Sequence, residues 1–418
     1  DFLTDPARVK VGHNAGYYDA AVVKRFLGVV PAPLLDTVLV SAGVESELPH
    51  GLGFLGTYLT DVHAWKAGHA ATDARTDAEL WRYGALDTVI NVQIVPPLWN
   101  ALHASNQRRW YDVMRRVQDV CREMHETGMP LDEVERARWE MFYVGSSPPP
   151  PRGEFAGRIG ERQRRLRDLA DRPRLNPNSI PQLGDLIFGT WGIKPVDVTD
   201  ADEPSTDDSV LRTLLSRAIP ERVREFVREL RLSRKDTKNY GNYIRDLPVL
   251  ADGRIHPTWN AHVAVTSRLS ASAPPMQQWP RRMRSTVAPR DENVLVYADM
   301  DQIESRMIAA LAGDERDLTA FREGRDIHAE TATMLFGRAF TDAVPEAKER
   351  IRDFSKRFRY AAQYGAGVVT VHETITSVED DDGCFIYADR SLAEIRKIYN
   401  RFKRDHAPIF KWAGEQVR

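Results

Sequence analysis

The segment RDFSKRFRYAAQYG carries two cations and two aromatic rings at a strict four-residue step: Arg352, Lys356, Tyr360 and Tyr364. Four residues advance an α-helix by about 400°, so these side chains form one slowly drifting stripe. Such a stripe suits a nucleotide, whose phosphates would meet the cations and whose flat base would meet the rings. An amphipathic helix with a solvated Arg/Lys edge and two core tyrosines would show the same spacing.

Acidic side chains gather just upstream, in VLVYADMDQIESR at 294–306. The apolar run predicts a buried strand that ends at Asp299, followed at once by a helix. Asp299 and Asp301 at a strand tip would suit Mg²⁺, which prefers hard oxygen ligands held on a rigid element. A second interpretation needs no metal, because Asp301 as N-cap with Glu304 three residues later resembles a capping box.

The overall composition limits the kinds of protein fold that could position these residues. The chain has 418 residues, 42% hydrophobic and 28% charged, which is enough for two to four globular domains. A net charge of −2 gives no overall basic signal, so nucleic-acid binding must depend on local patches. Two isolated cysteines exclude a disulfide scaffold, and no apolar run predicts a membrane span or signal peptide. A cytoplasmic location is expected.

The pattern along the chain alternates in character. Residues 1–100 mix short apolar runs with helical segments, as in an α/β domain. Within about 105–140 the pattern predicts a long amphipathic helix, which Gly128 closes. The proline run at 145–154 marks a boundary or loop. Residues 155–247 are helical and rich in arginine, 248–270 predict a strand hairpin, and 315–418 are mostly helix.

Several segments together resemble a known family. DMDQIESR (299–306) is similar to motif A of the family A DNA polymerases, and RDFSKRFRYAAQYG (352–365) to their motif B. GRDIHAETATMLFG (324–337) resembles the fingers segment, and TSRLSASAPPMQQWP (266–280) the TGRLS stretch. The resemblance implies template-directed DNA synthesis from dNTPs onto a primer 3′-hydroxyl.

Near the N-terminus, VGHNAGYYDAAVV (11–23) and YGALDTVI (83–90) are similar to the second and third motifs of the 3′–5′ proofreading exonuclease that often precedes such polymerases. The implied fold class is α/β and α+β multidomain, with a partial ribonuclease H-like exonuclease followed by a right-hand polymerase. The expected divisions are an exonuclease-like domain (1–104), connecting helices and thumb (105–250), part of the palm with motif A (251–315), and fingers with motif B (316–418).

The resemblance implies roles at the polymerase site. Asp299 would be one of two aspartates that bridge two Mg²⁺ ions, for which Mn²⁺ can substitute. Arg352, Lys356 and His328 would meet the triphosphate, and Gln302 would also contact the nucleotide. Glu304 would exclude a ribose 2′-hydroxyl. The remaining expectations are Tyr360 at the sugar 3′ position, Tyr364 beside the template base, and Arg268 and Gln277 in the minor groove.

In the exonuclease-like part, the resemblance makes Asp19 and Asp87 metal ligands, with Tyr83 positioning the attacking water and Asn14 ordering its loop. Both two-metal sites lack residues, since the first exonuclease motif and polymerase motif C are missing from the sequence. With no initial methionine and a helical pattern still running at Arg418, we expect a piece of a longer protein that is inactive alone. The acids at 379–382 are a candidate substitute for the missing ligands, but before Gly383 they favour a solvated turn.

The expected partners are primer–template DNA and dNTPs, with a processivity factor or replisome proteins as further candidate partners and no membrane. We expect a monomer that acts in the cytoplasm of a bacterial cell or a phage-infected host. Two alternatives stay open. The chain could be a non-catalytic DNA-binding remnant or one subunit of a split polymerase, whose arginines at 155–245 would bind DNA in a strongly salt-dependent way. It could also be a nuclease with a degenerate polymerase half, which the intact motif B stripe disfavours.

Overall fold

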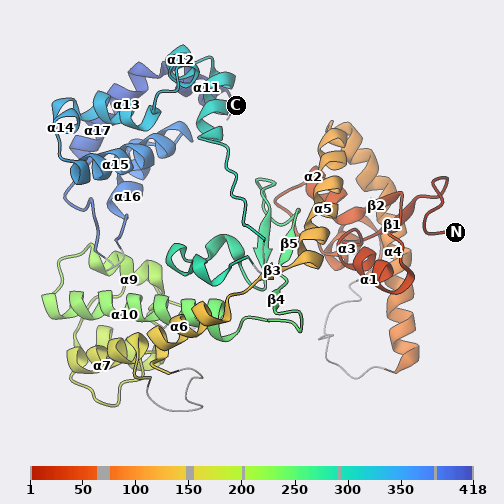
Figure 1. The fold of residues 1–418 in the computed structure, drawn as a ribbon, viewed down its shortest axis with the longest axis horizontal. Helices are drawn as coiled ribbons and strands as arrows, with labels where there is room; N and C mark the ends of the chain where they lie inside the picture. Colours follow the sequence, from red (N-terminus) through yellow and green to blue (C-terminus); the bar gives the residue numbers. More distant parts are fainter. Residues whose placement is uncertain are drawn as a thin grey trace. The chain divides into compact units, whose positions relative to one another are not determined.

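The fold is that of a computed structural model, which describes residues 2–63, 76–146, 155–199, 203–289, 293–380 and 384–416 (Figure 1). The chain divides into two units, one made of residues 1–161 and 235–295, the other of 162–234 and 296–418. Most of the proline run and the acids at 381–382 lie outside the described residues. None of the described helices has the length and apolar character needed to cross a membrane.

The first unit begins with two short parallel strands, β1 (Lys10–Gly12) and β2 (Leu34–Asp36), in the register Lys10 to Leu34 and Gly12 to Asp36. The strand β2 ends at Asp36, because Asp36 caps a helix by accepting a hydrogen bond from the amide of Val38. The helices of this part are α1 (Tyr18–Leu27), α2 (Thr37–Val44), α3 (Leu52–Leu59), α4 (Asp77–Ala104), α5 (Arg108–Thr127) and α6 (Glu133–Val144).

Their apolar faces share one core, which includes Leu39 of α2, Ile94 and Leu102 of α4, and Cys121 of α5. Helix α5 ends at Gly128, where φ is +63°, as the sequence predicts. The expected hairpin is also present, as the antiparallel strands β5 (Thr258–Asn260) and β6 (Ser270–Ser272). Short elements complete the unit: β3 (Met129–Pro130), β4 (Arg254–Ile255), η2 (Gly241–Arg245), η3 (Met276–Gln278) and η4 (Arg281–Thr286).

The second unit is helical in its described residues. Its first stretch contains α8 (Ile180–Gly184), η1 (Asp185–Thr190) and α9 (Asp208–Leu215). The boundaries between the units fall within α7 (Arg158–Ala170) and α10 (Glu221–Tyr240). Leu183, Leu211, Phe226 and Leu230 form the buried centre of this stretch. The sequence therefore predicts its helical character correctly.

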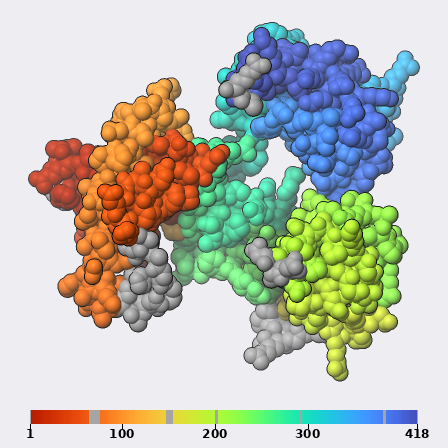
Figure 2. All heavy atoms as spheres, turned by 180° about the vertical axis from the view of Figure 1, so that it is seen from behind, coloured from red at the N-terminus to blue at the C-terminus, as the bar shows by residue number. Residues whose placement is uncertain are grey.

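The C-terminal stretch is a cluster of helices, drawn in cyan to blue (Figure 1), and Figure 2 shows the heavy atoms of the same stretch as spheres. Phe354 and Phe358 of α15 meet Ile395 and Phe402 of α17 in its buried core. The helices are α11 (Ile303–Ala312), α12 (Glu315–Arg322), α13 (Ile327–Phe336), α14 (Arg338–Thr341), α15 (Pro345–Gln363), α16 (Val368–Thr376), α17 (Leu392–Asp405) and α18 (Ala407–Gln416).

The predicted buried strand before Asp299 is wrong for this structure. Residues 293–300 form neither helix nor strand, and Val296 and Tyr297 are 87% and 85% exposed. A strand is stable when its backbone N–H and C=O groups pair with a neighbour, and this segment pairs with no strand in the described residues. Its apolar sequence alone is therefore not enough to bury it.

Candidate active site on helices α11, α13 and α15

Helix α15 carries the stripe that the sequence predicts. It begins with Pro345, whose fixed φ suits a first helical turn, and it ends at Tyr364, before Gly365 at φ +79°. Its buried face consists of Phe354, Phe358 and their neighbours, so the stripe lies on another side. Lys356 is exposed and Tyr364 is 59% exposed, while Tyr360 is half-buried. The interpretation with two core tyrosines is therefore wrong.

Helix α13 places His328 beside this stripe. The imidazole of His328 and the ring of Tyr360 are 5.5 Å apart between centroids. His328 is 1% exposed, and neither of its ring nitrogens has a hydrogen-bond partner within the described part of the chain. Burial lowers the pKa of His328 to about 4, with the charge of Arg359 and then those of Arg352 and Lys356 adding to the effect. The imidazole is therefore neutral near pH 7.

Arg352 is held by a carboxylate from the start of α13. Its Nε donates a 2.6 Å hydrogen bond to Oδ2 of Asp326, which is the N-cap residue of that helix. Burial alone would raise the pKa of Asp326, but the bonds from Arg352 and from the amides of Ala329 and His328 outweigh it and lower the pKa. An anionic Asp326 thus ties Arg352 to the helix that carries His328.

Helix α11 contributes Glu304 to the same face. The hydroxyl of Tyr364 donates a hydrogen bond to a carboxylate oxygen of Glu304. Beside this bond, Oγ of Ser305, one residue after Glu304, lies 3.1 Å from the side-chain amide of Gln363, one residue before Tyr364. Burial, and then the charge of Glu304, raises the pKa of the Tyr360 phenol. Glu304, Tyr360 and Tyr364 therefore form one group.

The residues just before α11 differ from the expected capping box. Gln302 is the N-cap, in a left-handed conformation with φ +52°, and no side chain caps the helix. Asp301 pairs instead with Arg306, at 3.2 Å between Oδ2 and Nη2. Gln302 donates through Nε2 to Asp301 Oδ1 at 3.2 Å. The capping-box interpretation is therefore wrong, and Asp301 neutralises a neighbouring arginine.

Asp299 is exposed on the unpaired segment. It belongs to no group of three Asp, Glu, His or Cys side chains with metal-ligand spacing among the described residues. It offers one oxygen-donor side chain of the kind that Mg²⁺ prefers, and the other ligand positions would fall to water, substrate phosphates or other carboxylates. A rigid metal cage is not preformed around Asp299.

One group with metal-ligand spacing does occur in the described residues, away from the predicted ligands: Asp314, Asp317 and His406. Nδ1 of His406 lies 3.1 Å from Oδ2 of Asp314 and 3.6 Å from Oδ1 of Asp317. Arg359 of α15 donates to the other oxygen of Asp317 and, at 2.7 Å, to Oγ1 of Thr331. Because the buried guanidinium already compensates a carboxylate, we interpret this group as an ion network that joins helices.

The hairpin residues occupy the first unit. Gln277 accepts a 2.8 Å hydrogen bond from the amide of Ala271 and donates a 3.0 Å bond to the carbonyl of Leu269, so it braces β6. Arg268 is exposed in the loop before β6, next to Ser267, whose hydroxyl accepts a 3.1 Å bond from the Trp110 indole. Both side chains remain exposed on this hairpin.

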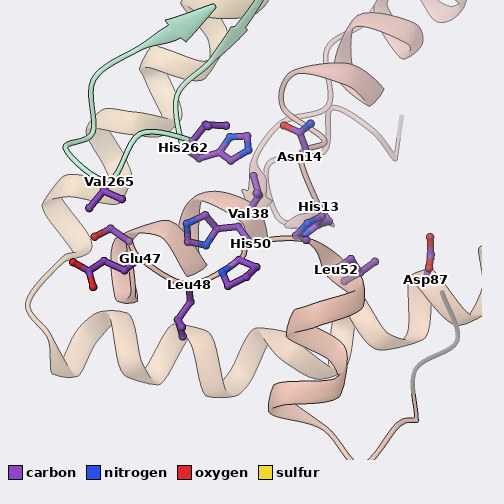
Figure 3. A pocket seen from close by; sticks show the side chains of 14 residues that line it. His13, Asn14, Val38, Glu47, Leu48, His50, Leu52, Asp87, His262 and Val265 are labelled. Carbon is purple, nitrogen blue, oxygen red and sulfur yellow. The ribbon is translucent and has the colours of Figure 1, made fainter. Parts of the chain in front are cut away.

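A pocket of about 680 Å³ lies in the first unit, and Asp87, His13 and Asn14 are among its lining residues (Figure 3). Three imidazoles surround it, from His13, His50 and His262, and burial lowers the pKa of the latter two. Tyr83 stands one helical turn before Asp87 on α4. No local pattern marks these histidines, because they lie far apart in the chain, at positions 13, 50 and 262.

Asp19 does not line this pocket. It lies in the first turn of α1, where its surface is exposed but neighbouring atoms remove part of its hydration, and this desolvation, with a smaller contribution from the charge of Asp36, raises its pKa. Asp36 itself was missed. Its fully buried carboxylate accepts hydrogen bonds from the amides of Asn14 and Gly16 and from Gln118 Nε2. Asp36 orders this loop, and an N-cap signal, Asp-Thr after an apolar run, marks it in the sequence.

Comparisons with known proteins agree on one family. The family model described as DNA polymerase family A matches residues 152–415. The DNA polymerase of Bacillus phage SP01 is 26% identical over 73% of this chain and 34% of its own length. The thermostable DNA polymerase I of Thermus aquaticus is 30% identical over 69% of this chain and 33% of its own length. The DNA polymerase I of Pseudomonas aeruginosa is 28% identical over 97% of this chain and 44% of its own length.

Among solved structures, the POL domain of Pol1 from M. smegmatis, in complex with DNA primer-template and dNTP, has a similar fold. The TM-score is 0.71 with 20% identity, over 98% of this chain and 65% of the other. The chain thus spans a third to less than a half of the three curated relatives named above. The match to the family model covers more than half of the chain, and the chain therefore belongs to DNA polymerase family A.

Proposed function

We propose that the protein to which this chain belongs catalyses template-directed DNA synthesis, joining dNTPs to a primer 3′-hydroxyl. The observation that carries the proposal is the face formed by α13 and α15, where Arg352, Lys356, His328 and Tyr360 lie together. Two cations beside a neutral imidazole and an aromatic ring match a triphosphate joined to a nucleoside. The family membership and the fold of the M. smegmatis relative, solved with primer-template and dNTP, support the same function.

In this proposal Arg352 and Lys356 bind the triphosphate and stabilise the charge that develops during phosphoryl transfer. A neutral His328 donates one N–H to a phosphate oxygen, which offers the partner that its buried ring nitrogens lack. Tyr360 faces the sugar, where its phenol oxygen takes the place of a 3′-hydroxyl. Glu304, held by Tyr364, excludes a ribose 2′-hydroxyl, and Tyr364 also lies beside the template base.

Asp299 would hold Mg²⁺, with Gln302 close to the nucleotide. When bound there, the ion would supply Lewis-acid activation of the primer hydroxyl and neutralise charge on the leaving pyrophosphate. Because Asp299 supplies a single carboxylate on an exposed segment, we propose that this chain alone extends primers poorly and that further carboxylates are needed. Arg268 and Gln277 would contact the DNA minor groove beside the new base pair, on the hairpin that Gln277 braces.

We further propose the layout that the resemblance implies: an exonuclease-like domain over 1–104, thumb over 105–250, part of the palm over 251–315 and fingers over 316–418, acting in the cytoplasm of a cell or infected host. A second activity, 3′–5′ hydrolysis of DNA, is favoured by the pocket that Asp87 lines. Asp19 would need to approach this pocket to share a metal with Asp87, and Tyr83 to orient the attacking water.

The test is primer extension with the full-length polymerase, four dNTPs, Mg²⁺ and primed DNA. Asp299→Asn and Lys356→Gln should each abolish or strongly reduce extension, while Arg357→Gln, one position along α15 from Lys356, should leave it near wild type. Equal activity of Asp299→Asn and wild type would contradict the proposal. If the protein binds primer–template tightly but extends nothing under any condition, the non-catalytic or split-subunit alternative holds.

A further inference from the structure

Asp326 uses its two carboxylate oxygens for two different tasks. Oδ1 accepts hydrogen bonds from the amides of His328 and Ala329, at 2.9 Å and 3.2 Å, and thereby caps α13. Oδ2 accepts the 2.6 Å bond from Nε of Arg352, on α15. The cap fixes the carboxylate to backbone atoms, so the oxygen that Arg352 meets is held in place by the start of α13.

The geometry of this pair leaves Arg352 able to bind something else. A guanidinium presents five N–H donors in a rigid fork, one on Nε and four on the two Nη atoms. A contact through Nε fixes the plane of the guanidinium and leaves the Nη groups for a second acceptor. The same carboxylate holds the amide of His328, so the Arg352 guanidinium and the imidazole are oriented from one anchor.

A second arginine of α15 shows what an ordinary pair looks like. Nε of Arg357 donates to Oδ2 of Asp353 at 2.7 Å, but both belong to α15, four residues apart. The side-chain exposures of the two pairs are similar, 35% and 38% for Arg352 and Asp326 against 46% and 38% for Arg357 and Asp353. The Arg352 pair therefore differs in joining two helices and in resting on a helix cap.

We propose that Asp326 is a positioning residue for the nucleotide triphosphate: it orients Arg352 through Nε so that the Nη groups face the phosphates beside His328. This inference rests on the proposed function of the α13–α15 face. Asp326 does not touch the nucleotide itself. A competing role, in which Asp326 occupies Arg352 and must be displaced by the phosphates, predicts the opposite effect of neutralising Asp326.

The test measures dissociation constants by calorimetry on the full 418-residue chain, with dATP, inorganic tripolyphosphate and deoxyadenosine as probes. Asp326→Asn keeps a capping side-chain oxygen and removes the charge, since Asn and Asp cap helices about equally well. We expect Asp326→Asn to raise the dissociation constants of dATP and tripolyphosphate by the same factor, about three- to fivefold. The dissociation constant of deoxyadenosine should not change. Asp112→Asn, which removes a carboxylate paired with Arg108 four residues away on α5, is the control and should leave all three constants at their wild-type values.

A double-mutant cycle separates positioning from folding. If Asp326 acts through Arg352, Asp326→Asn should weaken binding no further in an Arg352→Gln background. Asp326→Ser, a second capping residue without charge, should reproduce Asp326→Asn, while both variants unfold within a few degrees of wild type by calorimetric melting. Tighter binding by Asp326→Asn, or an unchanged constant, would overturn the inference.

The proposed function of the α13–α15 face and the positioning role of Asp326 can be contradicted separately. If Arg352→Gln binds dATP as tightly as wild type, or wild type binds neither phosphate probe, the proposed function of this face fails. If Arg352→Gln weakens both phosphate probes by about tenfold or more, as expected for a lost charge-assisted hydrogen bond, and Asp326→Asn does not, only the role of Asp326 fails.

Discussion

The hydroxyl of Tyr364, at the end of α15, donates a hydrogen bond to the carboxylate of Glu304 in the first turn of α11. The bond joins the two sequence motifs that the polymerase resemblance depends on, and it restrains the side chain proposed to meet the sugar.

Removing this bond should reduce the preference for deoxyribonucleotides over ribonucleotides. Tyr364→Phe keeps the ring and removes the hydroxyl that restrains Glu304, so we expect the preference for a dNTP over the matching rNTP to fall roughly three- to tenfold in single-nucleotide incorporation. Tyr399→Phe is the control, because the Tyr399 hydroxyl donates to the carbonyl of Ala366 instead. An unchanged preference in Tyr364→Phe would show that the bond has no part in selection.

The buried imidazole of His328 predicts that the folded chain becomes less stable as the pH falls. Its pKa is about 4 in the folded chain against about 6.5 in an unfolded one, so between these values the unfolded state binds more protons. The stability contributed by neutral His328 is therefore fully present above about pH 6.5 and is lost as the pH falls toward 4, by up to about 3 kcal/mol.

The measurement is the NMR titration of the His328 Hε1 signal, assigned with His328→Gln, together with urea unfolding at several pH values. A midpoint near 4, and a shallower fall in stability with acid for His328→Gln than for wild type, are expected. A midpoint near 6.5 would contradict the buried, neutral state.

Tyr360 predicts how the enzyme treats chain terminators. Its phenol oxygen can substitute for a missing 3′-hydroxyl, so we expect dideoxynucleotides to be incorporated nearly as efficiently as dNTPs by the full-length polymerase. Tyr360→Phe should raise discrimination against them about tenfold, the equivalent of one hydrogen bond. Strong rejection of dideoxynucleotides by the wild-type enzyme would contradict this role.

The ion network beneath α15 predicts a large effect on stability. Arg359 and Asp317 pair with side chains 2% and 3% exposed, whereas Arg357 and Asp353 pair at 46% and 38%. Arg359→Met leaves a buried carboxylate without its guanidinium and should destabilise the chain by about 3–5 kcal/mol in urea unfolding. Arg357→Met should cost less than about 1 kcal/mol, and equal costs would show that Arg359 is not a structural partner.

Sequence patterns predicted the helices well where the evidence for them is local. The i, i+4 stripe and the glycine after Tyr364 define α15, and Gly128 closes α5 as predicted. The run VLVYA failed as a strand because a strand depends on a partner elsewhere, which no local pattern supplies.

The contacts that the sequence did not predict join residues that are far apart in the chain. Asp36 bonds Gln118 across 82 residues, and His406 meets Asp314 across 92. Neither pair has a spacing that periodicity could reveal. Asp19 and Asp87 were united by the resemblance alone, and whether they share a metal stays a prediction.

The most direct test of the nucleotide site is photolabelling of the chain with 8-azido-dATP, followed by peptide mapping. The account predicts adducts within residues 352–364 that excess dATP or tripolyphosphate suppresses and that Lys356→Gln reduces. Adducts confined to the pocket around His13 and Asp87, or spread over the chain regardless of competitor, would contradict a triphosphate site on α13 and α15.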